Sequence, residues 1–180
     1  EVNRPTHVFV QAGVGSLAGG VVGYFANLYP NNPPKFIVME AGAADCLYKG
    51  AEAGDGEPRI VGGDLQTIMA GLACGEPNTI GWDILRNHVS AFISCPDWVS
   101  AKGMRMLAAP VKGDPSVTSG ESGAVGMGVI SSIMTDDTYK ELREALELDN
   151  SSQVLMFSTE GDTDPDKYKK IVWGGEYPTV

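Results

Sequence analysis

The sequence predicts an α/β protein in which a mainly parallel sheet lies between two layers of helices. Three observations support this three-layer fold class. Residues 6–10, 35–40 and 153–157 are short runs rich in β-branched and aromatic residues, without strict alternation, as expected of strands buried on both faces. Longer apolar or amphipathic segments separate these runs. Strand, helix and strand also follow one another near the N-terminus, and such βαβ units build parallel sheets with right-handed connections.

The first βαβ unit is the clearest part of the pattern. The strand at 6–10 leads into a glycine-rich turn at 11–16. The apolar stretch 17–29 is too long for a strand, so we predict a helix there. The two asparagines and two prolines at 31–34 end this helix, and the strand at 35–40 follows.

The segment 50–81 is interrupted by many glycines and prolines, and we interpret it as a long structured loop with helical character only at 65–72. Long loops in compact domains are often functional. The remaining elements are predicted from helical periodicity and from flanking turn residues. They are helices at 43–48, 82–88, 96–108, 124–134, 138–148 and 166–173, and a strand at 91–94.

The composition is that of an ordinary globular domain and argues against several classes of protein. The 180 residues suit one domain, 1–180, with 43% hydrophobic and 20% charged residues. The net charge of -10 argues against a nucleic-acid partner, because phosphate backbones attract lysine and arginine. No apolar run approaches the roughly 18 residues that span a bilayer, and residues 1–5 do not begin a signal peptide. We therefore expect a cytoplasmic protein without a membrane partner.

Three cysteines, Cys46, Cys74 and Cys95, are too few and too widely spaced for a zinc ribbon. Three buried thiols in a reducing compartment are one interpretation. A single disulfide is the other, and we would then pair Cys46 with Cys74, because both flank the glycine-rich stretch that a bridge would order. Such a bridge requires Cα atoms within about 7 Å of one another.

The glycine turn after the first strand is the first candidate binding site. Gly13, Gly15, Gly19 and Gly20 lie between a strand and a helix, where ligands of parallel sheets bind. Glycines let backbone amides approach an anion, the helix N-terminus offers unpaired N–H groups, and Ser16 adds a hydroxyl. The pattern is not a Walker motif, and its spacing, G-x-G-x-x-x-G, is one residue longer than the dinucleotide fingerprint. Tight helix–strand packing is an equally good explanation of the glycines.

Two further loops are rich in serine, threonine, glutamate and glycine, at 119–123 and 158–161. The second directly follows a buried strand. If both loops meet the glycine turn at one edge of the sheet, they form a pocket with an anion cradle, hydroxyls and a carboxylate. The hydroxyl of Ser158 would be able to hydrogen-bond an aromatic ring nitrogen.

Five strings of residues resemble the diaminopropionate ammonia-lyases. They are THVFVQAGVG (6–15) with AGG (18–20), the segment from GGD (62–64) to GLACGEPN (71–78), SGESGAVG (119–126) and FSTEGDTD (157–164). The resemblance covers essentially the whole chain in order, and the strings at 71–78 and 158–164 are distinctive. More distantly, the layout is similar to that of the serine and threonine dehydratases among the fold-type II, tryptophan-synthase-like pyridoxal-phosphate (PLP) enzymes.

The resemblance implies that the chain is the C-terminal, PLP-cradling part of the large domain of a longer PLP enzyme. Such enzymes eliminate the β-amine of 2,3-diaminopropionate, a small amino acid, to give pyruvate and ammonia. The resemblance also implies that the backbone amides of the phosphate loop hold the PLP phosphate, and that a hydroxyl faces the pyridine nitrogen while PLP acts as the electron sink. A homodimer is implied for the complete enzyme. The implied cofactor-binding residues are Gly13, Val14, Gly15 and Ser16 in the loop, Ser158 or Thr159 at the nitrogen, and Glu121 with Ser122 near the ring.

The chain departs from the family at the catalytic lysine. The family's Schiff-base lysine and its proton-abstracting acids lie upstream of the glycine loop, so we expect no catalytic residue in these 180 residues. None of the eight lysines resembles a buried nucleophile. Lys35 precedes a strand and Lys112 lies in a turn. We expect the other six to be exposed on helices; they are Lys49, Lys102, Lys140, Lys167, Lys169 and Lys170.

A second departure concerns metal binding. Related racemases and dehydratases hold a cation with a glutamate, a carbonyl and an aspartate, and the matching positions here are Glu40, Ala44 and Cys46. The hard oxygen ligand is missing at the last position, so we expect no divalent metal site. His7, in the middle of a strand, is interpreted as a hydrogen-bonded core histidine. Two rival functions stay open: a serine/threonine dehydratase-like PLP lyase, and a non-catalytic module that binds a phosphate or nucleotide.

Overall fold

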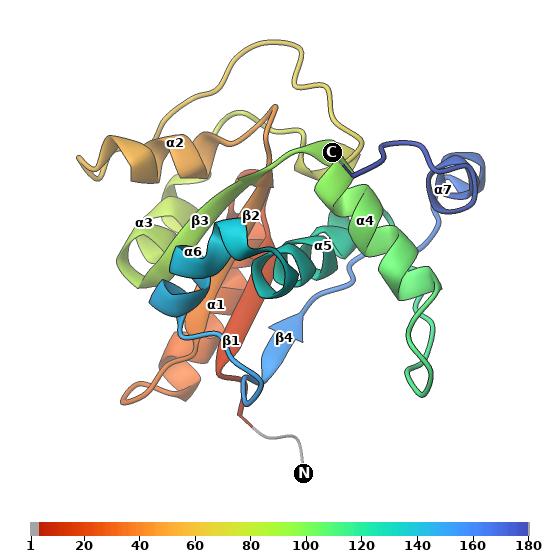
Figure 1. Ribbon diagram of the computed structural model, residues 1–180. Helices are drawn as coiled ribbons and strands as arrows, with labels where there is room; N and C mark the ends of the chain where they lie inside the picture. The colour runs from red at the N-terminus through yellow and green to blue at the C-terminus, as the bar shows by residue number, and fades with distance from the viewer. Residues whose placement is uncertain (1–3, 180) are drawn as a thin grey trace.

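The computed structural model describes residues 4–179. They contain one four-stranded parallel sheet with helices around it (Figure 1). The strand order is β3-β2-β1-β4, so β1 lies between β2 and β4. Because parallel strands end at the same edge, the segments after β1, β2 and β4 are brought together there. The strands are β1 (His7–Gln11), β2 (Lys35–Ala41), β3 (Val89–Cys95) and β4 (Val154–Met156).

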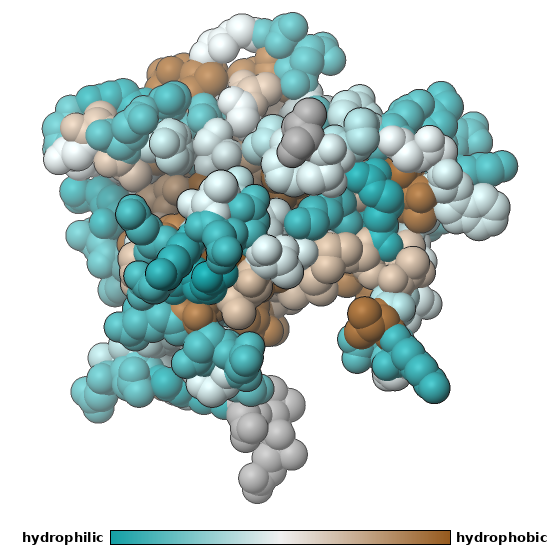
Figure 2. Space-filling model, viewed as in Figure 1, coloured by the Kyte–Doolittle hydropathy of each residue, from teal (hydrophilic) through white to brown (hydrophobic). Residues whose placement is uncertain are grey.

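Helices cover both faces of the sheet, which confirms the three-layer prediction. The α-helices are α1 (Ser16–Leu28), α2 (Cys46–Ala53), α3 (Thr79–His88), α4 (Asp97–Ala108), α5 (Glu121–Thr135), α6 (Lys140–Leu146) and α7 (Pro165–Val172). Two short 3-10 turns are η1 (Ala70–Leu72) and η2 (Asp137–Tyr139). Figure 2 shows that the surface over α6 is hydrophilic, in agreement with the amphipathic helix that the sequence predicts near 138–148.

The strands contribute side chains to two separate hydrophobic cores, one under each layer of helices. Side chains of a strand alternate between its faces. In β1, Phe9 belongs to the core beneath α4, α5 and α7, whereas Val8 and Val10 belong to the core beneath α1, α2 and α3. All three are fully buried. Burial on both faces explains why the strand sequences are continuously apolar.

His7 occupies a buried position in β1, as the sequence predicts. Its Nε2 lies 2.8 Å from the carbonyl oxygen of Leu146, and its Nδ1 lies 2.8 Å from Oγ1 of Thr6. Both ring nitrogens are therefore hydrogen-bonded, and the side chain is 3% exposed. The interpretation of a satisfied core histidine is confirmed.

The prediction of helical structure at 65–72 is wrong except for η1. Leu65 has a positive φ of 52°, which a helix does not permit. The backbone of Ile68 is bound by side chains instead: its N–H donates to Asp97 Oδ2 at 3.1 Å, and its carbonyl accepts from Lys167 Nζ at 3.1 Å. Tertiary hydrogen bonds have replaced the helical ones in this segment.

Smaller differences concern the ends of elements. Helix α2 begins at Cys46 rather than at 43, α5 begins at Glu121 rather than at 124, and β3 is longer than the predicted strand. The predicted helix at 138–148 is divided into η2 and α6 and ends at Glu147, where φ is 57°. Among residues 4–179, no helix is long and apolar enough to cross a membrane.

Candidate functional site

The glycine turn joins the end of β1 to the start of α1. Gly15 is the N-cap residue of α1 with a φ of 91°, a left-handed conformation that favours glycine. Within the described chain no side chain caps the first turn of α1, so its leading amides stay available. The first helical bond of the turn runs from Gly19 N to Gly15 O at 2.8 Å. The turn therefore has the geometry of an anion-binding helix N-terminus.

Packing explains part of the glycine pattern as well. A Cβ at Gly13 would lie 3.3 Å from Leu72 Cα, and one at Gly19 would lie 3.0 Å from Gly81 Cα. A Cβ at Gly20 would meet nothing within 4 Å. Packing thus accounts for Gly13 and Gly19 and the backbone angle for Gly15, whereas anion binding at the turn stays a prediction.

The segment 71–78 forms a wall beside this turn. Asn78 N donates to Val14 O at 2.8 Å, so the turn is bonded directly to the start of α3. The Asn78 side chain caps α3 by accepting from Gly81 N at 2.8 Å. The string at 71–78 therefore has a structural role: it holds the phosphate-loop candidate in place.

The other two predicted loops meet at the N-terminus of α5. Ser158 Oγ donates to Ser119 Oγ at 2.9 Å, and Ser119 is 1% exposed. Glu160 accepts from Ser122 N at 2.6 Å through its carboxylate and from Gly120 N at 3.0 Å through its carbonyl oxygen. The loops at 119–123 and 158–161 are therefore joined by hydrogen bonds.

Gln11 connects the end of β1 to the loop after β4. Its Nε2 donates to Phe157 O and to Thr159 Oγ1, both at 2.9 Å, and the side chain is 2% exposed. Pairing between the two strands stops at Phe9 and Met156, so this amide continues the link beyond the sheet. Gln11 was not among the predicted site residues. A polar side chain at the end of a fully buried strand would have indicated that it needs a hydrogen-bond partner.

Ser122 carries an unsatisfied buried hydroxyl. Its Oγ has no hydrogen-bond partner among the described residues, and the residue is 4% exposed. Buried polar atoms are rarely left without a partner. The atom lies beside the 71–78 wall, since a Cβ at Gly71 would be 3.1 Å from it. An uncapped α1 N-terminus and an orphaned hydroxyl fit a ligand with an anionic group and polar ring atoms.

Glu121 is bound to a lysine of α7. Its Oε1 lies 3.2 Å from Lys167 Nζ, with side-chain exposures of 12% for the glutamate and 32% for the lysine. The expectation that Lys167 is an exposed helical lysine is therefore wrong. Its long side chain follows the protein surface and places the ammonium group between two acceptors, Glu121 and the Ile68 carbonyl.

Glu40, near the end of β2, is fully buried and caps the first turn of helix α2 with its side chain. Its Oε1 accepts from Leu47 N at 2.9 Å and its Oε2 accepts from Tyr48 N at 2.6 Å. Burial raises the pKa of this carboxyl to about 8, because desolvation outweighs the hydrogen bonds from the two amides. Both carboxylate oxygens thus hold backbone amides. Among the described residues no group of three histidine, cysteine or acidic side chains is arranged to hold a metal.

The disulfide considered between Cys46 and Cys74 is not formed, and all three cysteines are free. Cys46 Sγ instead points at oxygen atoms: it lies 3.8 Å from Glu40 Oε1 and 3.7 Å from the Cys74 carbonyl oxygen. Burial raises the pKa of the Cys46 and Cys95 thiols to about 12, so both are protonated and unreactive at neutral pH.

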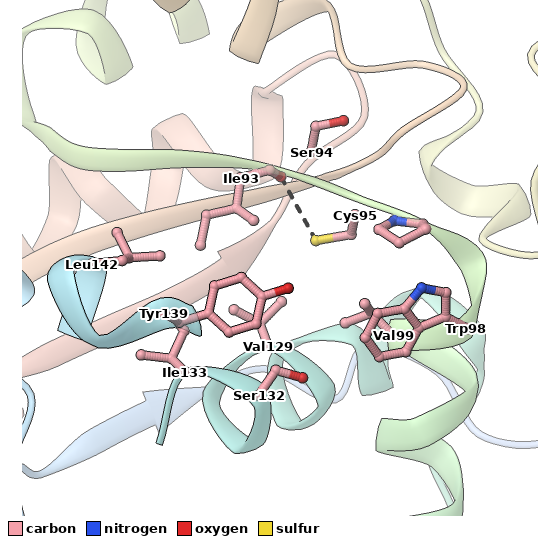
Figure 3. A pocket seen from close by; sticks show the side chains of 11 residues that line it. Ile93, Ser94, Cys95, Trp98, Val99, Val129, Ser132, Ile133, Tyr139 and Leu142 are labelled. Carbon is pink, nitrogen blue, oxygen red and sulfur yellow. Dashed lines mark hydrogen bonds between the residues drawn. The ribbon is translucent and has the colours of Figure 1, made fainter. Parts of the chain in front are cut away.

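A separate apolar pocket lies beside β3, away from the glycine turn. Figure 3 shows the pocket between the strand, the start of α4, α5 and η2. Its walls include Ile93, Val129 and Leu142, and Cys95 Sγ donates to the Ile93 carbonyl at 3.7 Å. Its lining residues are mostly apolar and include no arginine or lysine.

Comparisons with known proteins agree with this geometry. The family model described as pyridoxal-phosphate dependent enzyme matches residues 1–160. The diaminopropionate ammonia-lyase of Salmonella typhimurium is 54% identical over 172 residues, which cover 95% of this chain and 43% of that protein.

Solved structures resemble the chain over nearly its whole length. The diaminopropionate ammonia-lyase of Escherichia coli, in complex with an aminoacrylate–PLP azomethine reaction intermediate, has a TM-score of 0.88 and 48% identity, covering 98% of this chain and 44% of that one. Maize serine racemase has a TM-score of 0.72 at 20% identity, covering 97% and 49%, and so shares the fold. The chain spans less than half the length of these relatives. It belongs to the family of pyridoxal-phosphate-dependent enzymes.

Proposed function

We propose that this chain is the cofactor-cradling part of a PLP-dependent ammonia-lyase that eliminates the β-amine of 2,3-diaminopropionate. The 54% identity to a diaminopropionate ammonia-lyase supports the substrate. The observation that carries the site is the convergence of three loops, at 11–16, 119–123 and 158–161, on the carboxyl edge of the sheet, with the α1 N-terminus uncapped within the described chain. A phosphate and a polar ring need this combination.

The roles of the residues follow from their positions. The amides of Gly13, Val14, Gly15 and Ser16 bind the phosphate, which the positive end of the α1 dipole stabilises. Bound PLP supplies an electron sink for the elimination. The chain's own residues orient the ring: the hydroxyl of Ser158 or of Thr159 faces its nitrogen. Hydrogen bonds position both side chains, from Ser158 Oγ to Ser119 Oγ and from Gln11 Nε2 to Thr159 Oγ1.

Thr159 Oγ1 accepts from Gln11 Nε2 and so keeps its own proton to donate, whereas Ser158 Oγ donates to Ser119 Oγ and would exchange that bond for one to the ring nitrogen. We therefore assign the ring-nitrogen contact to one of these two neighbouring hydroxyls, Ser158 or Thr159. Glu121 is paired with Lys167 and supports the site from beside it. The lysine that forms the Schiff base and the acids that abstract the proton come, in this proposal, from the remainder of a longer protein, which also forms the homodimer and acts in the cytoplasm.

The test compares a full-length protein with the 180-residue chain, each supplied with PLP and 2,3-diaminopropionate, by assaying pyruvate. We expect pyruvate only from the longer form. Serine and threonine are tested in parallel; faster turnover of either would replace the proposed substrate with that of a dehydratase. Competition completes the test: displacement of bound PLP by nucleotides would support a non-catalytic nucleotide-binding module instead.

A further inference from the structure

The backbone N–H and C=O of Ile68 are each bound by a charged side chain. Asp97, at the start of α4, accepts from Ile68 N at 3.1 Å and from the hydroxyl of Thr67. Lys167, in α7, donates to Ile68 O at 3.1 Å and lies 3.2 Å from Glu121 Oε1 at the start of α5. Three elements distant in sequence therefore meet at one backbone position.

Ile68 lies just before the 71–78 wall that supports the glycine turn. Ile68 and Met69 are buried, at 2% and 0% exposure, and lead directly into η1. The backbone of Leu72 then lies against Gly13, and Asn78 N bonds to Val14 O. Displacement of Ile68 would therefore be transmitted to the turn through contiguous backbone.

The segment before Ile68 has few constraints of its own. Residues 62–64 and 66 are exposed, Gly63 has a φ of 113°, and a Cβ at Gly62 or Gly63 would meet nothing within 4 Å. Such a segment opens locally at low free-energy cost. Ile68 therefore anchors the end of an exposed segment whose other described bond to the wall is from Val61 N to Gly75 O, at 2.8 Å.

The Lys167–Glu121 ion pair should contribute more to stability than an exposed surface ion pair. The Glu121 carboxylate is largely shielded from water, and the ammonium group also donates to a buried backbone carbonyl. Removal of the ammonium group leaves the shielded Glu121 carboxylate without its cation, which costs more than the loss of an exposed pair. It also takes one of two donors from the Ile68 carbonyl, which accepts from Ala70 N as well, at 2.9 Å.

We propose that Lys167 is a positioning residue for the cofactor site, because its ammonium group, with Asp97 opposite, clamps the Ile68 backbone and so holds the 71–78 wall that follows against the phosphate-binding turn. This inference rests on the proposed binding of PLP at that turn. Lys167 acts through Ile68 and Glu121 and touches neither the phosphate cradle nor the reacting atoms.

The experiment uses the full-length protein and the variants Lys167→Met, Lys167→Arg and, as the matched control on the same helix, the exposed Lys170→Met. Methionine keeps the length and the helix propensity of lysine. PLP dissociation constants are measured by titration, and amide hydrogen exchange is measured over residues 66–75. We expect Lys167→Met to weaken PLP binding about tenfold or more, as loss of a charge-assisted hydrogen bond predicts, and to accelerate exchange in the wall.

Lys167→Arg should restore both values, and Lys170→Met should match the wild type. Unchanged exchange and unchanged PLP affinity in Lys167→Met would overturn the clamp. If the wild type binds no PLP, the proposed function fails, whereas faster exchange at 66–75 in Lys167→Met would still demonstrate the clamp. A loss of affinity shared by Lys170→Met would also count against it, since the effect would then belong to the helix and not to the ammonium group.

Discussion

Strands β1 and β2 are neighbours and end at the same edge of the sheet. The helices that follow them differ in whether a side chain bonds the backbone amides of their first turn. After β1, the N-terminus of α1 is left uncapped by side chains of the described chain. After β2, the buried Glu40 accepts from Leu47 N and Tyr48 N in the first turn of α2. Helix N-termini need hydrogen-bond acceptors for their amides. Helix α2 therefore finds its acceptor within the chain, whereas the first amides of α1 have no side-chain acceptor among the described residues, as the proposed phosphate site requires.

The pH dependence of Glu40 provides the largest test of this difference. Its pKa rises from 4.5 to about 8 on folding, so the folded state binds the proton more tightly. This contribution to stability is complete below about pH 4.5 and is lost as the pH rises through 8; the shift corresponds to on the order of 5 kcal/mol. Thermal unfolding from pH 4.5 to 9 should show this loss in the wild type, and Glu40→Gln should lack it. Parallel curves for the two proteins would refute the assignment.

Removal of the internal acceptor should also destabilise the fold directly. Glu40→Ala leaves the amides of Leu47 and Tyr48 unpaired in a buried position, at a cost of about 3 kcal/mol. Thermal unfolding at pH 6 measures the loss. Glu52→Ala is the control, because Glu52 lies on the same helix in an exposed ion pair with Lys49, worth at most about 0.5 kcal/mol. Equal effects of both substitutions would show that the cap contributes nothing special.

Substitution of Gly15 tests the ligand-binding side of the comparison. Gly15→Ala forces a side chain into a left-handed conformation, and its methyl group would lie 3.1 Å from Leu85 Cδ1. We expect a loss of about 1–2 kcal/mol of stability and a distorted cradle that binds PLP at least about tenfold more weakly, measured by titration of the full-length protein. Gly20→Ala is the control, with open space around it; it should keep PLP affinity and stabilise α1 by about 0.5–1 kcal/mol.

Ser122 should give the smallest effect, with opposite signs in the two states. Ser122→Ala removes a buried hydroxyl that lacks a partner among the described residues. Without PLP, the variant should gain about 1 kcal/mol of stability. The affinity for PLP should fall severalfold, because the ligand atom loses the hydroxyl to which it bonds in this proposal. Thermal unfolding with and without PLP separates the two effects, and a variant that binds PLP as well as the wild type would remove Ser122 from the site.

Much of the fold was predictable because it depends on local patterns. Runs of apolar residues at β1, β2 and β4 predict strands buried on both faces; the structure confirms this burial for β1 and β2, whereas β4 is a strand at the edge of the described sheet and is only partly buried. The boundaries of α2 and α5 were less accurate, since a distant acceptor, Glu40 in one case and Glu160 in the other, bonds amides of the first turn. A local pattern contains no information about such partners.

The residues of the candidate site also differ in whether a local pattern could predict them. The turn at Gly13–Ser16 was predictable, because glycines between a strand and a helix have a local physical meaning. Gln11 was not singled out, since its value comes from Phe157 and Thr159, which are almost 150 residues away. The thiol state of Cys46 was equally open until the structure showed which atoms its sulfur faces.

The sequence by itself determined the α/β class, the central strands, the glycine cradle and the resemblance to a PLP enzyme, because each depends on residues that are close together along the chain. Only the tertiary structure decided that Lys167 reaches Ile68 and Glu121, that Glu40 caps α2, and that a buried hydroxyl at Ser122 lacks a partner within the described residues. The physical reason is that hydrogen bonds and desolvation depend on which distant groups the fold brings within about 3 Å of one another.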